Sequence, residues 1–253
     1  MKMKRWLLLL LKLILVPILL FVIYIMIILI DVAQDERDAD AVPMGFGSFN
    51  VIESSMIDPA TILSSINHDD QNVFNFELGF PPDDPPFVTS VEWRQEDFLN
   101  LATSIIHVAW NESINNWTLY RMDYWTRCDD LYGFSVGEVY FFQETSDHKK
   151  YSGRGIDMQP EYGYVTWGGD TYRRRPFFGW KVINLKEMTV TAEEALRRAE
   201  TGGGMEFRRS IENECGIFIQ LWPEVSGRYD WRVHYWDDNV YTNDEPEFWI
   251  PTK

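Results

Sequence analysis

The chain of 253 residues contains little of what builds the familiar active sites. It has only two cysteines, which excludes a small protein held together by many disulfides. Its four histidines are far apart, and none has the spacing of a metal ligand. The Gly-x-Ser-x-Gly, His-Glu-x-x-His, Gly-x-x-x-x-Gly-Lys and Cys-x-x-Cys motifs are all missing. We therefore expect no catalytic residue, no cofactor and no metal, and a protein that is not an enzyme.

Positive charge is also scarce. There are 23 basic and 39 acidic side chains, for a formal net charge of −16. Because the nucleic-acid backbone selects basic surfaces, this balance argues against a nucleic-acid partner. The aromatic content of 15%, with 11 tryptophans, is far too high for a disordered chain. The composition indicates an acidic, folded protein.

One long hydrophobic run follows the basic N-terminal residues MKMKR. Between Trp6 and Ile30 only Lys12 and Pro17 interrupt it, and 25 residues of helix span roughly 37 Å, enough for a bilayer core. A cleaved signal peptide is the alternative, although its apolar core is normally shorter. The positive-inside rule places the N-terminus in the cytoplasm. The prediction is a single-pass signal-anchor in the cell membrane, with the bilayer as partner of residues 6–30 and an extracytoplasmic ectodomain.

The two cysteines then lie in a compartment where disulfides persist. Cys128 and Cys215 are 87 residues apart, so a bridge would close a long loop and stabilise strongly. Two buried free thiols are the alternative. A catalytic cysteine is a third possibility, which no Cys–His arrangement supports. We expect the Cys128–Cys215 disulfide.

Composition and hydrophobic periodicity divide the chain into five parts. The N-terminal anchor is followed by an acidic stretch without apolar periodicity, and then by a segment that begins with a short helix and ends in a proline-rich loop. Two units follow, each a helix followed by strands. The predicted parts are the anchor 1–30, the acidic tether 31–56, the helix and loop 57–87, the first α+β unit 88–187 and the second 188–253.

The first unit begins with a helical stripe. Apolar residues recur on one face from Gln95 onward, and the helix is expected to end near Asn111. Residues rich in aromatic and β-branched side chains then predict strands. The strands are expected at 117–125, 136–142 and 157–167, with a turn at Gly168 and Gly169.

The second unit repeats this order. Thr191 and Glu194 have the spacing of a capping box, and the glycines at 202–204 are expected to end the helix. Alternating apolar residues predict strands at 217–222 and 229–235, with a short last strand at 248–250. The predicted fold class is α+β, with an N-terminal transmembrane helix and an ectodomain of two curved antiparallel sheets that each cradle one helix, in a cystatin-like arrangement.

The second unit resembles a PepSY-type module. The resemblance rests on the helix start Val190-Thr191-Ala192-Glu193-Glu194-Ala195-Leu196, the following glycines and the two alternating strands. The whole chain is also similar to bacterial single-pass membrane proteins with Cys-containing, Trp-rich ectodomains. The resemblance implies a non-catalytic extracytoplasmic module that restrains a peptidase or binds near the cell envelope.

A basic and aromatic segment is the candidate ligand site. Arg173, Arg174 and Arg175 are followed closely by Trp180, in an otherwise acidic chain. Guanidinium groups and an aromatic ring suit an anionic or sugar ligand. The alternative is that these arginines pair with the protein's own carboxylates. Acidic residues are so numerous that the sequence singles out no acid/base pair.

These features predict a membrane-anchored, extracytoplasmic, non-catalytic binding or interaction protein. Its expected partners are an envelope protein or an anionic or sugar ligand. One alternative is a regulator or inhibitor of an envelope peptidase. Another is a hydrolase with an unrecognised carboxylate site, for which a cleft with two facing acids would be the distinguishing feature.

Overall fold

The computed structural model describes most of the chain from residue 93 onward and several shorter stretches before it. Residues 15–27 are helical, and their apolar side chains are exposed. Within the described stretches, no helix combines the length and the apolar character needed to cross a membrane. The predicted anchor lies partly outside them. The described residues are 15–27, 45–49, 59–68, 74–78, 93–111, 113–129, 131, 133–144, 150–173, 183–223, 229–238 and 245–253.

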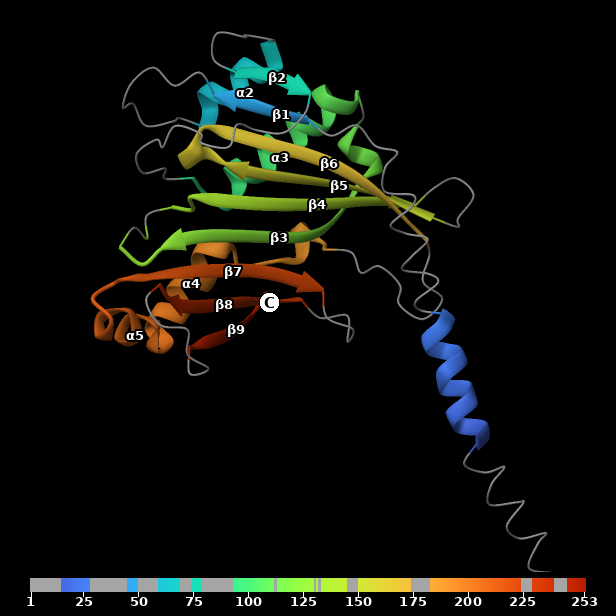
Figure 1. The fold of residues 1–253 in the computed structure, drawn as a ribbon. Coiled ribbons are helices and arrows are strands. Elements are labelled where there is room, and N and C mark those ends of the chain that lie inside the picture. The colour runs from blue at the N-terminus through green and yellow to red at the C-terminus, as the bar shows by residue number, and fades with distance from the viewer. Residues whose placement is uncertain are drawn as a thin grey trace, which may run out of the picture.

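The described strands form a single antiparallel sheet in the order β2-β1-β6-β5-β4-β3-β7-β8-β9 (Figure 1). All neighbours run antiparallel, so the expected α+β class is confirmed. The strands are β1 (Gly45–Phe49), β2 (Phe74–Leu78), β3 (Thr118–Arg127), β4 (Val136–Glu144), β5 (Lys150–Gln159), β6 (Tyr164–Arg173), β7 (Cys215–Pro223), β8 (Tyr229–Asp237) and β9 (Glu247–Pro251).

The helices lie on one face of this sheet, behind the strands in the view of Figure 1. Helix α3 contacts β4 and β5, whereas α4 contacts β7, β8 and β9. Short 3₁₀ turns at 114–116, 160–162 and 185–187 connect the elements. The helices are α2 (Pro59–His68), α3 (Gln95–Trp110), α4 (Ala192–Ala199) and α5 (Met205–Ser210), with a π-helical turn, Glu200–Gly204, between α4 and α5.

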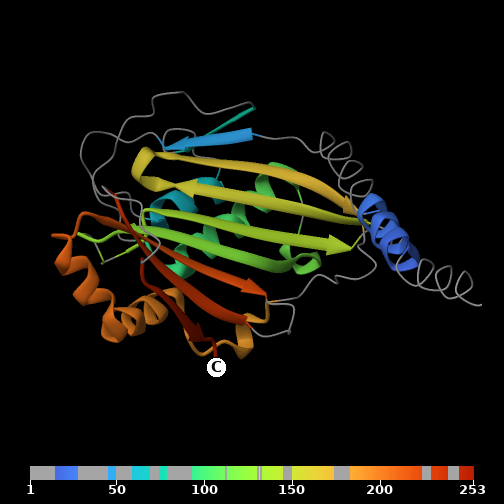
Figure 2. The same cartoon turned by 60° about the horizontal axis from the view of Figure 1, so that its bottom comes forward.

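The expected two separate sheets are one sheet in the structure. Helix α3 precedes the meander β3 to β6, and helices α4 and α5 precede the meander β7 to β9. The first strands of the two meanders, β3 and β7, pair with each other. This pairing satisfies two strand edges that would otherwise expose their hydrogen-bonding groups. Figure 2 shows how the sheet twists between the β4–β6 part and the β7–β9 part.

The two halves are related by a pseudo-twofold arrangement. The N-cap residues of α3 and α4, Arg94 and Thr191, are 97 positions apart. Asp123 and Gln220 are also 97 positions apart, and they face each other in the β3–β7 pair. When two equivalent residues of an antiparallel strand pair lie opposite each other, a twofold axis passes between them, here between Asp123 and Gln220. The same offset at the helix starts and at the strands indicates one unit used twice.

The helix N-termini also meet at this axis. The backbone N–H of Gln95 donates to Glu193 Oε1 at 2.7 Å, and the N–H of Ala192 donates to Gln95 Oε1 at 2.8 Å. Each helix therefore caps the other. The predicted N-cap at Thr191 is confirmed, since its hydroxyl accepts from the Glu194 N–H at 3.4 Å. The Glu194 carboxylate binds arginines of the next turn instead of closing the capping box.

The predicted stripe of α3 is buried against the sheet, and the helix ends at the left-handed Asn111 as expected. Phe98 is fully buried and packs on the Tyr124 ring at 5.5 Å between centroids. It lies directly on Gly137 of β4, where a β-carbon would come within 2.5 Å of the ring. Only glycine at this position allows the helix to approach the sheet so closely.

We expect Gly137→Ala to lower the free energy of unfolding by about 1–3 kcal/mol, because the added methyl group overpacks the Phe98 site. The measurement is denaturant unfolding of the full chain in detergent micelles. Gly202→Ala is the matched control, because its methyl group would meet Phe248 at an ordinary 3.4 Å. Equal stability of the two variants would contradict the proposed close contact.

Of the two chain breaks predicted at glycines, one is confirmed and one lies elsewhere. The glycines at 202–204 end helix α4 as expected, because the non-helical backbone of Gly203 separates it from α5. Gly203, with φ of 130°, supplies the kink, and a side chain at Gly204 would overlap the Tyr235 ring. Gly168 and Gly169 lie inside strand β6, and the turn before it is made by residues 160–163, with Gly163 at φ 73°.

The predicted tether at 31–56 contains a strand. Gly45–Phe49 forms β1, which pairs with β2 on one side and β6 on the other. The sequence of β1 has no apolar alternation. We attribute its place in the sheet to the backbone hydrogen bonds that it forms with the edge of β6. The short helix predicted in 57–87 is confirmed as α2, and β2 was not predicted. The proline-rich loop lies outside the described residues.

Candidate functional site

The face of the sheet opposite the helices carries polar and aromatic side chains. In strand β3, Met122 and Tyr124 point toward the helices and are fully buried. Successive side chains of a strand alternate between faces. Arg121, Asp123 and Trp125 therefore belong to the opposite face, which we call the open face. No helix among the described residues covers it.

Three carboxylates lie in one row across the open face. Asp123 of β3 is directly opposite Glu138 of β4, and Glu138 is directly opposite Asp157 of β5. Directly opposite side chains in an antiparallel pair are about 5 Å apart at Cβ, and like charges there are unfavourable. The row continues through Gln220 of β7 to Arg232 of β8. This concentration of like charge in the middle of a sheet needs compensation.

Arginine and tyrosine supply part of that compensation. The Arg121 guanidinium forms an ion pair with the fully buried Asp123 and lies 4.0 Å from Glu138. It also stacks over the Tyr140 ring at 5.1 Å. The Tyr140 hydroxyl donates a hydrogen bond to Glu138 Oε2 at 2.9 Å. Asp123 and Glu138 are thus both held by neighbouring side chains.

Asp157 is held on one oxygen only. Gln159 Nε2 donates to Asp157 Oδ2 at 2.8 Å, and the Tyr164 hydroxyl donates to Gln159 Oε1 at 2.6 Å. Asp157 Oδ1 is buried and has no hydrogen-bond partner. A buried acceptor without a donor is costly, and such an atom is a place where a ligand or water can bind.

Burial raises the pKa of both end carboxyls of the row. It raises the pKa of Asp123 to about 6, against the lowering effect of Arg121, and that of Asp157 to about 6, against the lowering effect of Gln159. The charge of Glu138 adds to both shifts. Both carboxyl groups therefore exchange their protons close to neutral pH.

A raised pKa means that the folded chain binds the proton more tightly than the unfolded chain. Stability contributed by proton binding is present below the ordinary carboxyl pKa and is lost as the pH rises through about 6. We expect Asp157→Asn, which resembles the protonated acid, to be more stable than the parent chain at pH 7.5 by about 1–2 kcal/mol. The two should converge near pH 4, measured by denaturant unfolding at each pH. For the control Glu206→Gln on α5, the free energy of unfolding should change with pH as it does for the parent. A difference between Asp157→Asn and the parent that is the same at every pH would contradict the pKa shift.

A pocket of about 560 Å³ lies at one end of this face. Glu138 and Asp157 form part of its wall, and Trp125 and Trp236 add aromatic surface. Trp236 lies across Gly216, where any side chain would overlap its ring, and Trp125 packs on Phe218 at 4.8 Å. We call this the open-face pocket. It is lined by Trp125, Thr126, Arg127, Asp129, Ser135, Val136, Glu138, Asp157, Gln159, Tyr162, Gly216, Trp236 and Asp238.

A larger hollow of about 1110 Å³ lies on the helix side. It runs between α3 and the segment 183–193 that leads into α4. Apolar side chains such as Leu99, Phe141 and Met188 line much of it. Its described lining residues include charges of both signs, Arg94, Glu96, Lys186 and Glu193, and form no row of carboxylates like that of the open face.

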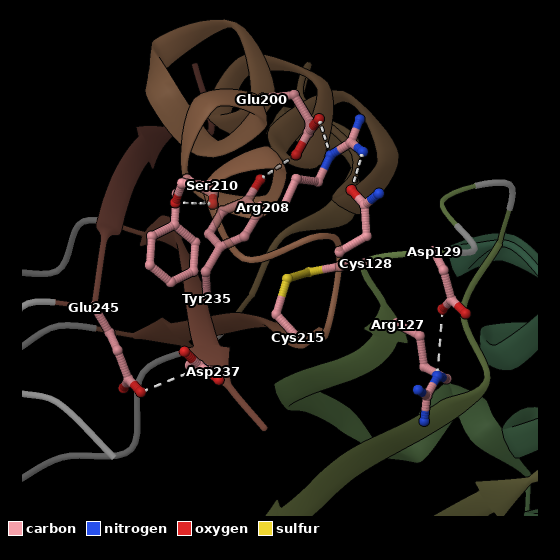
Figure 3. Close-up of a disulfide and its surroundings, with 12 residues drawn as sticks. Arg127, Cys128, Asp129, Glu200, Arg208, Ser210, Cys215, Tyr235, Asp237 and Glu245 are labelled. Atoms are coloured by element: carbon pink, nitrogen blue, oxygen red, sulfur yellow. Dashed lines mark hydrogen bonds and ion pairs between the residues drawn. A yellow bond between two sulfur atoms is a disulfide. The ribbon is translucent and has the colours of Figure 1, made fainter. Parts of the chain in front are cut away.

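The structure confirms the predicted disulfide. Cys128 follows β3 and Cys215 begins β7, with their Cα atoms 5.2 Å apart. The Cys128 N–H donates to the Cys215 carbonyl at 2.8 Å, so the bridge closes one end of the β3–β7 pairing. It is buried (Figure 3). The disulfide links the two units, as expected.

The predicted ligand-binding arginines are not placed. Arg173 is the last residue of β6, and its side chain is not described. Arg174, Arg175 and Trp180 lie outside the described residues. The open-face row was missed because the sequence shows only isolated acids at separate strand positions. Each of the three follows or precedes apolar residues of a strand, which is the only signal they share.

Among the described residues, no three histidine, cysteine, aspartate or glutamate side chains are grouped closely enough to hold a metal ion. The carboxylates of the row are thus neighbours without forming a metal centre. Comparison with known protein families, curated proteins and solved structures found no match.

Proposed function

We propose that the protein is a membrane-anchored, extracytoplasmic, non-catalytic binding protein whose ligand occupies the open-face pocket. The observation that carries this proposal is the pocket itself, where aromatic rings and charged groups meet on a face that no helix of the described residues covers. Ligand sites are typically hollows of 300–1,000 Å³ with a few polar groups that fix orientation. The pocket has this size and this mixture.

The membrane anchor in this proposal rests on residues 6–30. The described part, 15–27, is a helix with exposed apolar side chains, such as Leu20 and Phe21, at more than half of their full accessibility. Exposed apolar surface of this kind suits a lipid environment. The basic residues before it favour a cytoplasmic N-terminus. A protease-protection assay on membrane vesicles, in which the ectodomain should be digested only from the extracytoplasmic side, tests this orientation.

The binding proposal can be tested on the full chain extracted from its native membranes. Native mass spectrometry should show a bound species, and Trp236→Leu should lose it. Trp249→Leu is the matched control, because Trp249 lies on β9 outside the pocket and is 51% exposed. A bound species that survives in both variants, or that is lost in both, would place the ligand elsewhere. A parent chain without any bound species would overturn the proposal.

One observation favours a hydrolase as a second candidate. Glu138 and Asp157 are cross-strand neighbours on β4 and β5 and both line the pocket, so two carboxyl groups lie close enough to act on one ligand. Turnover of a panel of glycosides and esters by the full chain, abolished by Glu138→Gln, would establish this activity. No turnover above that of the Glu138→Gln variant would exclude it for those substrates.

Regulation of an envelope peptidase stays a prediction from the PepSY resemblance. The order of α4, β7 and β8 agrees with the helix-then-strands order on which that resemblance rests. Co-purification of the full chain with an envelope protease, and inhibition of that protease, would support it. An unchanged rate of proteolysis at saturating chain concentration would count against it.

A further inference from the structure

We infer that the open-face pocket binds an organic cation, through an ammonium or guanidinium group. This inference rests on the proposed binding function and adds the chemical class of the ligand. It follows from three features of the pocket: its charge, its aromatic walls and an oxygen of Asp157 that lacks a hydrogen-bond donor.

The charge of the pocket is strongly negative. Among the described residues that line it there are four carboxylates and one basic residue, Arg127. Arg127 is already engaged, because its Nε lies 3.3 Å from Asp129 Oδ1 (Figure 3). The remaining lining carboxylates, Glu138, Asp157 and Asp238, leave a net negative wall. A cationic ligand complements this charge, and an anionic or neutral ligand does not.

The aromatic walls add a second attraction for cations. Trp125, Tyr162 and Trp236 line the pocket, and the face of an aromatic ring attracts ammonium and guanidinium groups. Their neighbours hold them in place: Trp236 lies across Gly216, and Trp125 packs on Phe218. Rings fixed before binding lower the entropy cost of complex formation.

The unsatisfied acceptor gives the ligand a polar contact. Asp157 Oδ1 is buried without a hydrogen-bond donor, while Oδ2 is fixed by Gln159. An N–H of an ammonium group can supply the missing donor when the Asp157 side chain turns this oxygen toward the pocket, and the Gln159 bond to Oδ2 holds the other oxygen. Glu138 lies directly opposite on the next strand, so one cationic head group can meet both carboxylates.

A metal ion fits the pocket less well than an organic cation. No three potential metal-ligating side chains among the described residues are grouped to coordinate one. Hard divalent ions need about six oxygen ligands at short range, whereas an alkylammonium group needs a few acceptors and an apolar wall. The aromatic surface would contribute little to a hydrated metal ion.

The test is titration of the full chain in detergent micelles with spermidine, followed by tryptophan fluorescence and calorimetry. Asp157→Asn should weaken the affinity by about tenfold or more, because a charged hydrogen bond is lost. Glu206→Gln removes one negative charge from α5, outside the pocket, and should bind like the parent. Trp236→Leu should also weaken binding and remove the fluorescence change.

A second arm distinguishes the two sources of such a cation. A lysine-rich peptide with blocked ends is titrated beside spermidine, and the tighter of the two identifies a peptide or a free polyamine as the ligand type. Equal weakening by Asp157→Asn and Glu206→Gln would reveal a general charge effect and overturn the inference. So would displacement of spermidine by equimolar magnesium, or the absence of binding by either probe.

Failure of this inference can be told from failure of the proposed function. A co-purified species that Trp236→Leu loses, but that neither spermidine nor the peptide displaces, would leave a binding protein with a ligand of another class. Absence of both a co-purified species and cation binding would remove both proposals.

Discussion

Replacement of both cysteines by alanine, C128A with C215A, should lower the free energy of unfolding by about 4–5 kcal/mol. The bridge closes a loop of 87 residues, and in the chain-entropy model its loss restores that much conformational freedom to the unfolded chain. Both cysteines are buried, so the bridge also fills the core beside the β3–β7 pair. Because domains are stable by only about 5–15 kcal/mol, this loss is a large part of the total.

Denaturant unfolding of the full chain in detergent micelles measures the effect. The parent chain unfolded and refolded in the presence of a reductant should show the same loss as the double variant, which separates the bridge itself from the alanine substitutions. Thiol titration of the unreduced parent should detect no free thiol. Two titratable thiols, or a loss below about 1 kcal/mol, would contradict a stabilising bridge.

The helices of this chain could be predicted because their signals are local. The apolar stripe that begins at Phe98 and the N-cap at Thr191 both depend on residues within one or two turns. The glycines at 202–204 are a local signal of the same kind, and helix α4 does end there. In the folded chain Gly204 is also required by the Tyr235 ring, which comes from a strand more than thirty positions away.

The sheet and the candidate site could not be predicted in the same way. Strand β1 exists because β6 offers an edge, and its own residues carry no alternation. The row formed by Asp123, Glu138 and Asp157 depends on the register of three strands, since a slip of one residue would send each carboxylate to the opposite face. Register is a property of the assembled sheet, so isolated acids in a sequence with 39 of them carry no such information.

A buried ion pair joins Glu200, the first residue of the π-helical turn, to Arg208 of α5, and its loss should strongly destabilise the fold. Glu200, which is 8% exposed, accepts hydrogen bonds from Arg208 Nε at 2.8 Å and from the Tyr235 hydroxyl at 2.8 Å (Figure 3). Burial and the Glu200 charge raise the pKa of Tyr235, which keeps its hydroxyl protonated as a donor. Arg208 Nη1 also donates to Asn213 Oδ1 at 2.8 Å, and Asn213 has the left-handed φ of 63° at the end of this helical segment.

Arg208→Ala should therefore lower the free energy of unfolding by about 3 kcal/mol. Removal of one partner leaves the Glu200 carboxylate buried without its countercharge, which costs far more than the pair itself contributes. Arg209→Ala is the matched control, because Arg209 is the next residue in the chain and is exposed. This substitution should change the free energy of unfolding by less than about 0.5 kcal/mol. The double variant E200Q with R208A should recover part of the loss, because no uncompensated charge remains. If the single and double variants are equally unstable, Arg208 acts through the Asn213 contact and the packing of its side chain, and the buried charge is not the cause.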